Sequence, residues 1–282
     1  MKSIAATLAL FACACSAFCA VGITDGDGRK FAFAAPPRTV SITPVVSELI
    51  FEIGAQDYLV GVSTFSNLYG RDIPCVGSSY GLDWEKILAL RPEVVVSSNI
   101  KDKTIEKRLA PYGIKVVYLH KEGLANIAKD VLMLGELYGR RAAAASLAAD
   151  FNRRISVKFG GRKLRALLLT SMVAAGRGSF MSDILNICGF ENCADKIDAP
   201  WPALQREFIL QENPEVIFSV YFDDAQKRAD LEYFRSDTAW RHTDAVRNNR
   251  IFFIPLNDII LPSTKVAKVV ARLMSIRESL EK

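Results

Sequence analysis

The sequence predicts an α/β fold of two Rossmann-like lobes, each with a mostly parallel sheet, joined by one long rigid helix. Three observations lead to this prediction: one helix-and-strand pattern occurs twice, expected strands and helices alternate along the chain, and a single long helix separates the two halves. Of the 282 residues, 50% are hydrophobic and 24% are charged, which is typical of a folded globular protein.

The repeated pattern lies in residues 83–96 and 207–218. In each copy a glutamate, Glu85 or Glu207, is followed by Ile-Leu, by Pro-Glu-Val seven residues on, and by an apolar run. The offset is constant at 122 residues, since 207 minus 85 and 214 minus 92 agree. We interpret each copy as a short amphipathic helix that a proline ends before a buried strand begins. Each glutamate then stands near a helix start, where the helix dipole favours negative charge.

The N-terminal half predicts a hairpin followed by alternating strands and helices. Asp27-Gly28 separates two segments with alternating apolar residues, which indicates a hairpin over residues 23–33. Besides the first copy of the repeat, the expected strands are residues 39–42, 58–62 and 114–119, and the expected helices are residues 44–51, 103–109 and 124–138.

A helix over residues 140–159 is expected in the middle of the chain. It begins after Gly139, carries apolar residues at every fourth position from Ala143 to Phe159, and ends at Gly160-Gly161. A helix of about 20 residues is about 30 Å long. We interpret it as a stiff connector that limits how far the lobes open, with an ordinary core helix of one lobe as the alternative.

The second half repeats the alternation of the first. Besides the second copy of the repeat, the expected strands are residues 164–170 and 250–255, and the expected helices are residues 180–187 and 266–280. The expected organisation is a signal peptide at residues 1–22, an N-terminal lobe with its leading hairpin at 23–138, the interdomain helix at 139–160 and a C-terminal lobe at 161–282.

The first residues are typical of a secretory signal. Met1-Lys2 precedes an apolar, alanine-rich run over residues 4–20, and small residues at Ala20 and Gly22 allow cleavage after Gly22. Leu10-Phe11-Ala12-Cys13 resembles a lipoprotein box, so a lipid anchor stays open. The run is short and rich in small residues, which favours secretion over a retained membrane span.

The cysteines and histidines are too few for a metal site built from protein side chains. Only His120 and His242 are present, and three of the six cysteines lie in the signal region. We therefore expect no intrinsic cofactor, and any metal would arrive already chelated. Cys188 and Cys193 flank a turn, so a disulfide and two free thiols are both open.

Enzymatic motifs are weak. Gly77-Ser78-Ser79-Tyr80-Gly81 matches the G-x-S-x-G of a hydrolase, but the preceding residues 73–76 are short and interrupted by proline, and helix signals resume only near Asp83. A hydrolase using Ser79 with His242 is therefore a distant alternative. The net charge of +5 is scattered, so we expect no nucleic-acid partner.

Aromatic and small polar residues gather where strands are expected to lead into helices. Ligands of open α/β folds bind at the carboxyl ends of strands, and two aromatic walls suit a large flat ligand. Trp201, between Pro200 and Pro202, is the strongest candidate, whereas Phe180 and Phe222 could equally be core and Arg177 solvated. The candidate ligand-binding residues are Ser79, Tyr80, Arg177, Phe180, Trp201, Tyr221 and Phe222, with Thr43, Ser63 and Phe65 beside them.

Several short motifs lie along the chain from about Ile23 to the C-terminus. They are Thr24-Asp25 with Arg29, Arg38-Thr39-Val40-Ser41, Ser47-Glu48-Leu49, Val76-Gly77, Glu85 to Val94, Leu134-Gly135 with Gly139, Gly189 with Asn192, Trp201-Pro202-Ala203-Leu204 with Glu207, Pro214-Glu215-Val216-Ile217, and Trp240 with Ala245-Val246 and Asn248. With these motifs, which are weak singly and specific together, the chain resembles periplasmic binding proteins of the helical-backbone class, which deliver cobalamin, ferric siderophores or haem to ABC importers.

The resemblance implies a non-catalytic, periplasmic protein, and we expect a monomer, with a ligand cleft between the lobes. It also implies that Glu85 and Glu207 meet arginines of the permease of an ABC complex in the inner membrane, fixing the docking orientation. The motifs around Trp201 and Glu207 look most like cobalamin-binding members. The sequence departs from these at Ser79, where they carry an aromatic residue, with Tyr80 beside it. Haem-binding members place a tyrosine where this sequence has Ser78, so a haem role requires Tyr80 to take that position. A ferric siderophore is the other alternative, because Arg177 and the mild positive charge suit an anionic chelate.

Overall fold

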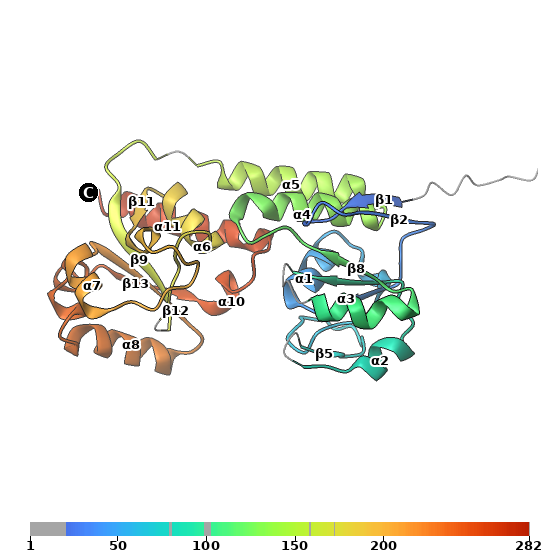
Figure 1. The fold of residues 1–282 in the computed structure, drawn as a ribbon. Helices are drawn as coiled ribbons and strands as arrows, with labels where there is room; N and C mark the ends of the chain where they lie inside the picture. The colour runs from blue at the N-terminus through green and yellow to red at the C-terminus, as the bar shows by residue number, and fades with distance from the viewer. Residues whose placement is uncertain (1–20, 79–80, 99–102, 158, 172, 282) are drawn as a thin grey trace, which may run out of the picture.

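The computed structural model describes residues 21–78, 81–98, 103–157, 159–171 and 173–281. The expected signal segment up to residue 20, and the candidates Ser79 and Tyr80, lie outside these residues. Figure 1 shows two lobes side by side, with the helices α4 (Leu124–Leu137) and α5 (Arg141–Ile155) along one side of the molecule. The predicted α/β fold of two lobes is confirmed.

The leading hairpin is present. Strand β1 (Val21–Thr24) pairs antiparallel with β2 (Lys30–Phe33), with Val21 opposite Phe33 and Gly22 opposite Ala32. Val21 and Gly22 thus belong to a paired strand, so cleavage after Gly22 would remove its first half. Among the described residues, no helix is long and apolar enough to cross a membrane.

The N-terminal lobe contains a parallel sheet with the strand order β4-β3-β7-β8. The two central strands of this sheet are fully buried, because helices cover both of its faces. The strands are β3 (Thr39–Ser41), β4 (Leu59–Gly61), β7 (Val94–Ser97) and β8 (Lys115–Tyr118), and the helices are α1 (Pro44–Glu52), α2 (Trp84–Ala89) and α3 (Lys103–Leu109), with a small hairpin of β5 (Gly77–Ser78) and β6 (Gly81–Leu82).

The C-terminal lobe has the same topology, with the parallel order β11-β9-β12-β13 and β10 added antiparallel to β9. In both lobes the first strand lies between the second and the third. The strands are β9 (Leu164–Thr170), β10 (Val173–Ala174), β11 (Phe190–Asn192), β12 (Val216–Tyr221) and β13 (Ile251–Pro255), and the helices are α6 (Phe180–Ile187), α7 (Arg206–Glu212), α8 (Asp224–Ser236), α9 (Asp244–Arg247), α10 (Leu256–Ile259) and α11 (Ala267–Ser279).

The sequence repeat forms equivalent units in the two lobes. Helices α2 and α7 each end before a proline, and the residue before that proline, Arg91 or Asn213, has a positive φ of 47° or 42°. Proline disfavours the α conformation of the preceding residue, so the helix stops there and the chain turns into β7 or β12. The two-lobe interpretation of the repeat is therefore confirmed.

An arginine at the start of each first strand holds this turn. The backbone N–H of Arg38 donates to Glu93 Oε2 at 2.9 Å, and that of Arg165 donates to Glu215 Oε2 at 3.1 Å. Their guanidinium groups donate to the last carbonyls before the prolines, of residues 90 and 91 in one lobe and 212 and 213 in the other. We call each Arg–Glu pair a strand clamp, because it fixes the helix end, the turn and two adjacent strands together.

The connecting helix is shorter than expected. Helix α5 ends at Ile155, not at Phe159, whose ring instead packs under the Arg277 guanidinium at 4.1 Å. Helix α5 packs on α4 of the first lobe and on α11 of the second, and Gly135 of α4 allows close contact with Ala144. The connection is therefore a packed helix pair that both lobes support.

The positions of Cys188 and Cys193 relative to the sheet show whether they can form a disulfide. Cys188 and Cys193 are free and buried. Cys188 packs in the core with Leu168 of β9, whereas Cys193 packs with Leu167, and alternate strand residues face opposite sides of a sheet. Burial raises the pKa of each thiol to about 12. The two thiols therefore lie in separate cores and form no disulfide.

The strand clamp predicts a stability effect. Glu215 is buried, accepts two hydrogen bonds from Arg162 at 3.0 and 2.8 Å, and its pKa is lowered chiefly by that arginine. Glu215→Gln should lower the free energy of unfolding by about 1–3 kcal/mol at neutral pH, because charge-assisted bonds are lost. A depressed carboxyl pKa stabilises above the unfolded value and not below it, so the difference should shrink as pH falls through the acidic range. Urea unfolding measures both effects.

The exposed Glu278 provides the matched control. Glu278→Gln should leave the urea midpoint unchanged. An equal effect of the two substitutions, or a Glu215 effect that persists in acid, would contradict the clamp.

Candidate binding cleft

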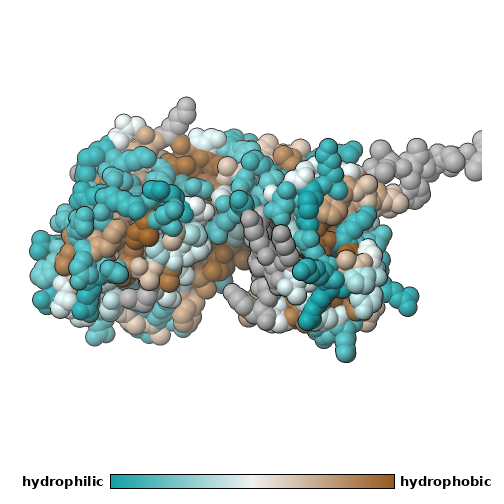
Figure 2. Space-filling view, viewed as in Figure 1, coloured by the Kyte–Doolittle hydropathy of each residue, from teal (hydrophilic) through white to brown (hydrophobic). Residues whose placement is uncertain are grey.

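The carboxyl ends of both sheets border a cleft between the lobes. Figure 2 shows the molecule hollowed between them, with hydrophobic side chains on the wall of the C-terminal lobe. Three adjoining cavities of about 900, 370 and 360 Å³ lie along the cleft. They share lining residues, namely Pro44, Glu122, Ile260, Leu261 and Pro262, and so form one continuous site.

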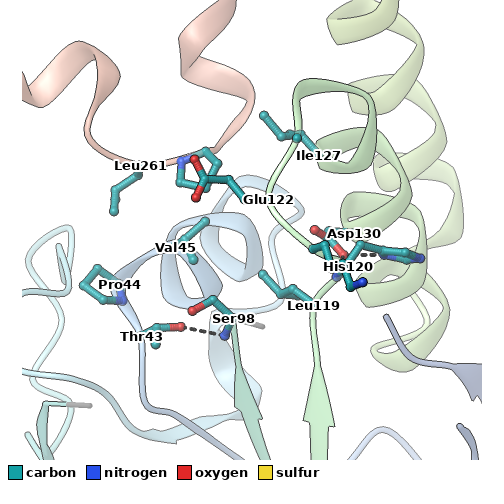
Figure 3. Close-up of a pocket in the computed structure, with 13 residues that line it drawn as sticks. Thr43, Pro44, Val45, Ser98, Leu119, His120, Glu122, Ile127, Asp130 and Leu261 are labelled. Carbon is teal, nitrogen blue, oxygen red and sulfur yellow. Dashed lines mark hydrogen bonds and ion pairs between the residues drawn. The ribbon is translucent and has the colours of Figure 1, made fainter. Parts of the chain in front are cut away.

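The N-terminal wall is built at the ends of β3, β7 and β8 (Figure 3). Thr43 precedes α1, and its Oγ1 accepts a hydrogen bond from the Ser98 N–H at 3.0 Å, which ties two strand ends together. His120 Nδ1 lies 2.7 Å from Asp130 Oδ1, and the imidazole points toward α4, away from the cavity. Burial raises the pKa of Asp130. His120 is thus a positioned structural residue in this wall.

The C-terminal wall is aromatic and apolar. Trp201 and Phe180 line the cavity of about 370 Å³ together with Val173 and Met181. Trp201 is 37% exposed and Phe180 is 2% exposed, so the indole presents most of the aromatic surface of this wall. Aromatic faces of this kind bind flat apolar ligands.

Glu122 joins the two walls. It stands before α4 in the N-terminal lobe and points toward the segment that carries Leu261 (Figure 3). Its carboxylate accepts hydrogen bonds from the Phe180 N–H at 3.3 Å and from the Trp201 side chain. Burial raises the pKa of Glu122. Beside it, Asp183 of α6 accepts from the first N–H of α4 at Leu124, at 2.8 Å, so one lobe caps a helix of the other.

A second polar bridge crosses the cleft at its largest cavity. Lys265, in a short 3-10 helix before α11, pairs with Glu48 of α1 and donates to the Tyr69 hydroxyl at 2.6 Å. Glu52, one turn after Glu48, is hydrogen-bonded by the side chain and backbone of Thr264. Burial, and then the charge of Glu48, raise the pKa of Glu52 to about 7. Glu52 Oε2 has no hydrogen-bond partner among the described residues.

The sequence-predicted ligand residues fall into separate groups. Phe180 and Trp201 meet in the cleft. Tyr221, at the end of β12, packs on Phe253 at 6.2 Å with Lys227 above both rings, and Phe222 is 69% exposed. Tyr221, Phe222 and the exposed Arg177 are not among the lining residues of the three cavities. The ligand-binding assignment of all seven residues, Phe180, Trp201, Ser79 and Tyr80 included, stays a prediction.

Sequence reasoning missed much of the lining. Glu122 and the segment from Ile260 to Pro262, which each line more than one of the cavities, were not singled out, and neither was Lys265, which lines the largest of them. This segment directly follows the carboxyl end of β13, and that position was the available signal.

The charge of the cleft is more acidic than basic. Among the described residues that line the three cavities, the acids are Glu48, Glu122, Asp130 and Asp258, the bases are Lys121 and Lys265, and there is no arginine. In the part of the chain that the structure describes, no cluster of three His, Cys, Asp or Glu residues could hold a bare metal ion.

The G-x-S-x-G match does not lie in the context of a nucleophile elbow. Strand β5, which ends at Ser78, pairs antiparallel with β6, which begins at Gly81, so the chain returns as a strand where an elbow continues as a helix. Helix α2 begins only at Trp84.

Glu85 and Glu207 occupy equivalent surface positions. Each lies in the first turn of its helix, α2 or α7, and each is exposed. Asp83 caps α2 by accepting from the Lys86 N–H at 3.0 Å. The two strand clamps hold these helices at corresponding places on the two lobes.

Residues 40–257 match the model of the periplasmic binding protein family. The chain belongs to this family. Family members are substrate-binding proteins, and membership implies a periplasmic location. Its relatives include the vitamin B12-binding protein of Pectobacterium carotovorum, 27% identical over 199 residues that cover 66% of this chain and 72% of the relative. The cobalamin-binding protein of Halobacterium salinarum is 22% identical over 272 residues, covering 90% and 74% of the two chains.

Solved structures share the fold. The periplasmic vitamin B12 binding protein BtuF of Vibrio cholerae has a TM-score of 0.74 and 21% identity, over 88% of this chain and 99% of that one. The periplasmic haem-binding protein HutB of Vibrio cholerae also has a TM-score of 0.74, with 20% identity over 85% and 98%. The family fold therefore supports sites for different ligands.

The raised pKa of Glu52 predicts a pH-dependent stability. Between its ordinary value of 4.5 and about 7, the folded protein binds this proton more tightly than the unfolded chain does. The free energy of unfolding should therefore fall as pH rises through this window. Glu52→Gln, which cannot ionise, should be more stable than the parent by about 1–3 kcal/mol at pH 8 and equal to it near pH 4.5. Thermal unfolding at the two pH values tests this; the same difference at both would contradict it.

Proposed function

We propose that this family member is the solute-binding component of an ABC importer and captures a corrinoid in the interlobe cleft. The observation that carries the proposal is the continuous cleft, with the indole of Trp201 on one wall and strand-end loops on the other. Together its cavities exceed the size of about 1,000 Å³ at which ordinary small-molecule pockets end, which suits a large ligand. Relatives named as vitamin B12- or cobalamin-binding proteins support the same ligand.

The charge of the cleft supports a corrinoid over an anionic chelate. The amide groups around a corrin ring donate hydrogen bonds, and carboxylates such as Glu122 and Asp258 accept them. Haem carboxylates and anionic siderophores instead favour arginine, which is absent among the described lining residues of these cavities. A ferric siderophore or haem remains the second candidate, because haem-binding proteins share the fold.

Delivery is proposed to use Glu85 and Glu207. Two exposed carboxylates on equivalent helices of the two lobes give a docking surface with one contact on each lobe. Basic groups of a membrane permease would meet both at once, which fixes orientation and speeds encounter. We assign no catalytic role to the chain and no cofactor other than the captured chelate.

Calorimetric titration of the purified protein with cyanocobalamin, haemin and a ferric siderophore tests the ligand. We expect one-to-one binding of cyanocobalamin. Trp201→Ala should weaken it about 30-fold, because removing a central aromatic contact costs about 2 kcal/mol.

Trp84→Ala is the matched control, since Trp84 lies on α2 under the Arg108 guanidinium, away from the cleft lining. It should leave the affinity unchanged. Binding of haemin or the siderophore in place of cyanocobalamin would contradict the corrinoid. Ester turnover that Ser79→Ala removes would favour a hydrolase.

Uptake assays test the docking surface. Glu85→Ala combined with Glu207→Ala should reduce transport at least tenfold while ligand affinity stays constant, because both charges lie outside the cleft. The exposed Glu232 and Glu278, changed to Ala together, provide a control with the same loss of charge. Unchanged transport in the first double variant would exclude this docking assignment.

A further inference from the structure

Helix α1 carries two carboxylates, Glu48 and Glu52, on the face toward the C-terminal lobe, and contact with a ligand alone does not explain them. Glu48 and Glu52 are four residues apart, so both side chains project from one face of the helix. Both meet the short 3-10 helix Thr264–Val266, which precedes α11 in the other lobe. Glu48 has a side chain only 4% exposed, although it is charged.

The hydrogen bonds around Glu48 form a closed set. The Tyr69 hydroxyl accepts from Lys265 Nζ at 2.6 Å and donates to the Glu48 carboxylate, whose oxygens lie at 2.8 and 2.7 Å. The Tyr69 ring packs on Phe51 at 4.9 Å, and its backbone has a positive φ of 48°. A non-glycine residue takes this conformation at a cost, so its surroundings hold it there.

Lys265, Glu48 and Tyr69 lie where the two lobes meet beside the cleft. Lys265 lines the largest cleft cavity on one side and a separate cavity against Leu147 and Asp150 of α5 on the other. Lys265 therefore lies between the connecting helix and the ligand space. A rotation that separates the two lobes there would break its bonds to Glu48 and Tyr69.

We infer that Lys265, Glu48 and Tyr69 form an interlobe latch that holds the cleft at its binding width and thereby slows ligand release. The inference rests on the proposed function for its ligand but not for its geometry. Lys265 is the cation nearest to both Glu48 and Glu52. Asp150 and Arg154 of α5 line the separate cavity on the other side of this lysine. Without the lysine, Glu48 keeps a desolvated charge in the closed arrangement and regains water only when the lobes part. A preorganised cleft binds more tightly mainly by slower dissociation.

The test compares Lys265→Met, Glu48→Gln and their combination with Lys268→Met, which removes a lysine from an exposed position three residues on. The first measurement is the distance between the lobes in ligand-free protein. Spin labels at the exposed positions 107 and 232, on α3 and α8, with Cys75 changed to Ser, report the distance between the lobes. Loss of the latch should broaden or shift this distance, and Lys268→Met should leave it as in the parent.

The second reading is the dissociation rate of cyanocobalamin by stopped flow. Lys265→Met should raise it about tenfold. The double variant should add little to either single change, because each single change already removes the same Lys265–Glu48 ion pair. Tyr69→Phe removes only a hydroxyl and should give a smaller increase in the dissociation rate. It keeps the test decisive if a variant that removes a charge folds poorly. An unchanged interlobe distance in Lys265→Met and Tyr69→Phe would overturn the latch. Failure of the parent to bind cyanocobalamin would contradict the proposed function instead, and the label distances would still decide the latch.

Discussion

The pairing of an arginine with the glutamate of Pro-Glu-Val is the interaction on which the rest of this molecule depends. In each lobe it connects the start of the first strand to the end of α2 or α7 and to the turn that leads from this helix into the third strand. Both lobes contain it, their sheets share one strand order, and their helices α2 and α7 occupy equivalent places. The positions of Glu85 and Glu207, and the direction in which the strands end, follow from this one arrangement.

The cleft is the consequence of those strand ends. The carboxyl ends of both sheets supply its loops, such as Thr43 and Ser98 in one lobe and the segment after β13 in the other. Carboxylates then cross between the lobes: Glu122 and Asp183 accept backbone N–H groups, while Glu48 pairs with Lys265. Each of these bonds gains from burial only while the lobes stay together, so the width of the cleft and its polar chemistry are linked.

The sequence predicted what local pattern determines. The repeat, the alternation of strands and helices, and the leading hairpin could be read from periodicity and turn residues, and β9 and α6 have the expected bounds. Helix α8 was missed because Phe234 is its only buried residue among those described, although Asp223 caps it. Helix α5 was extended too far because Phe159 continues the apolar spacing from outside the helix. The cleft was predicted at Phe180 and Trp201, but Glu122 and Lys265 gain their roles from the other lobe, which no local pattern reports.

The proposed function requires a ligand that lies between the lobes in contact with both walls. A crystal structure of the protein grown with cyanocobalamin tests this most directly. We expect density for the corrin ring against the Trp201 indole, with the amides of the ring facing the loops that carry Thr43 and Glu122. A corrinoid bound elsewhere on the surface, or a cleft occupied only by water at saturating ligand, would contradict it.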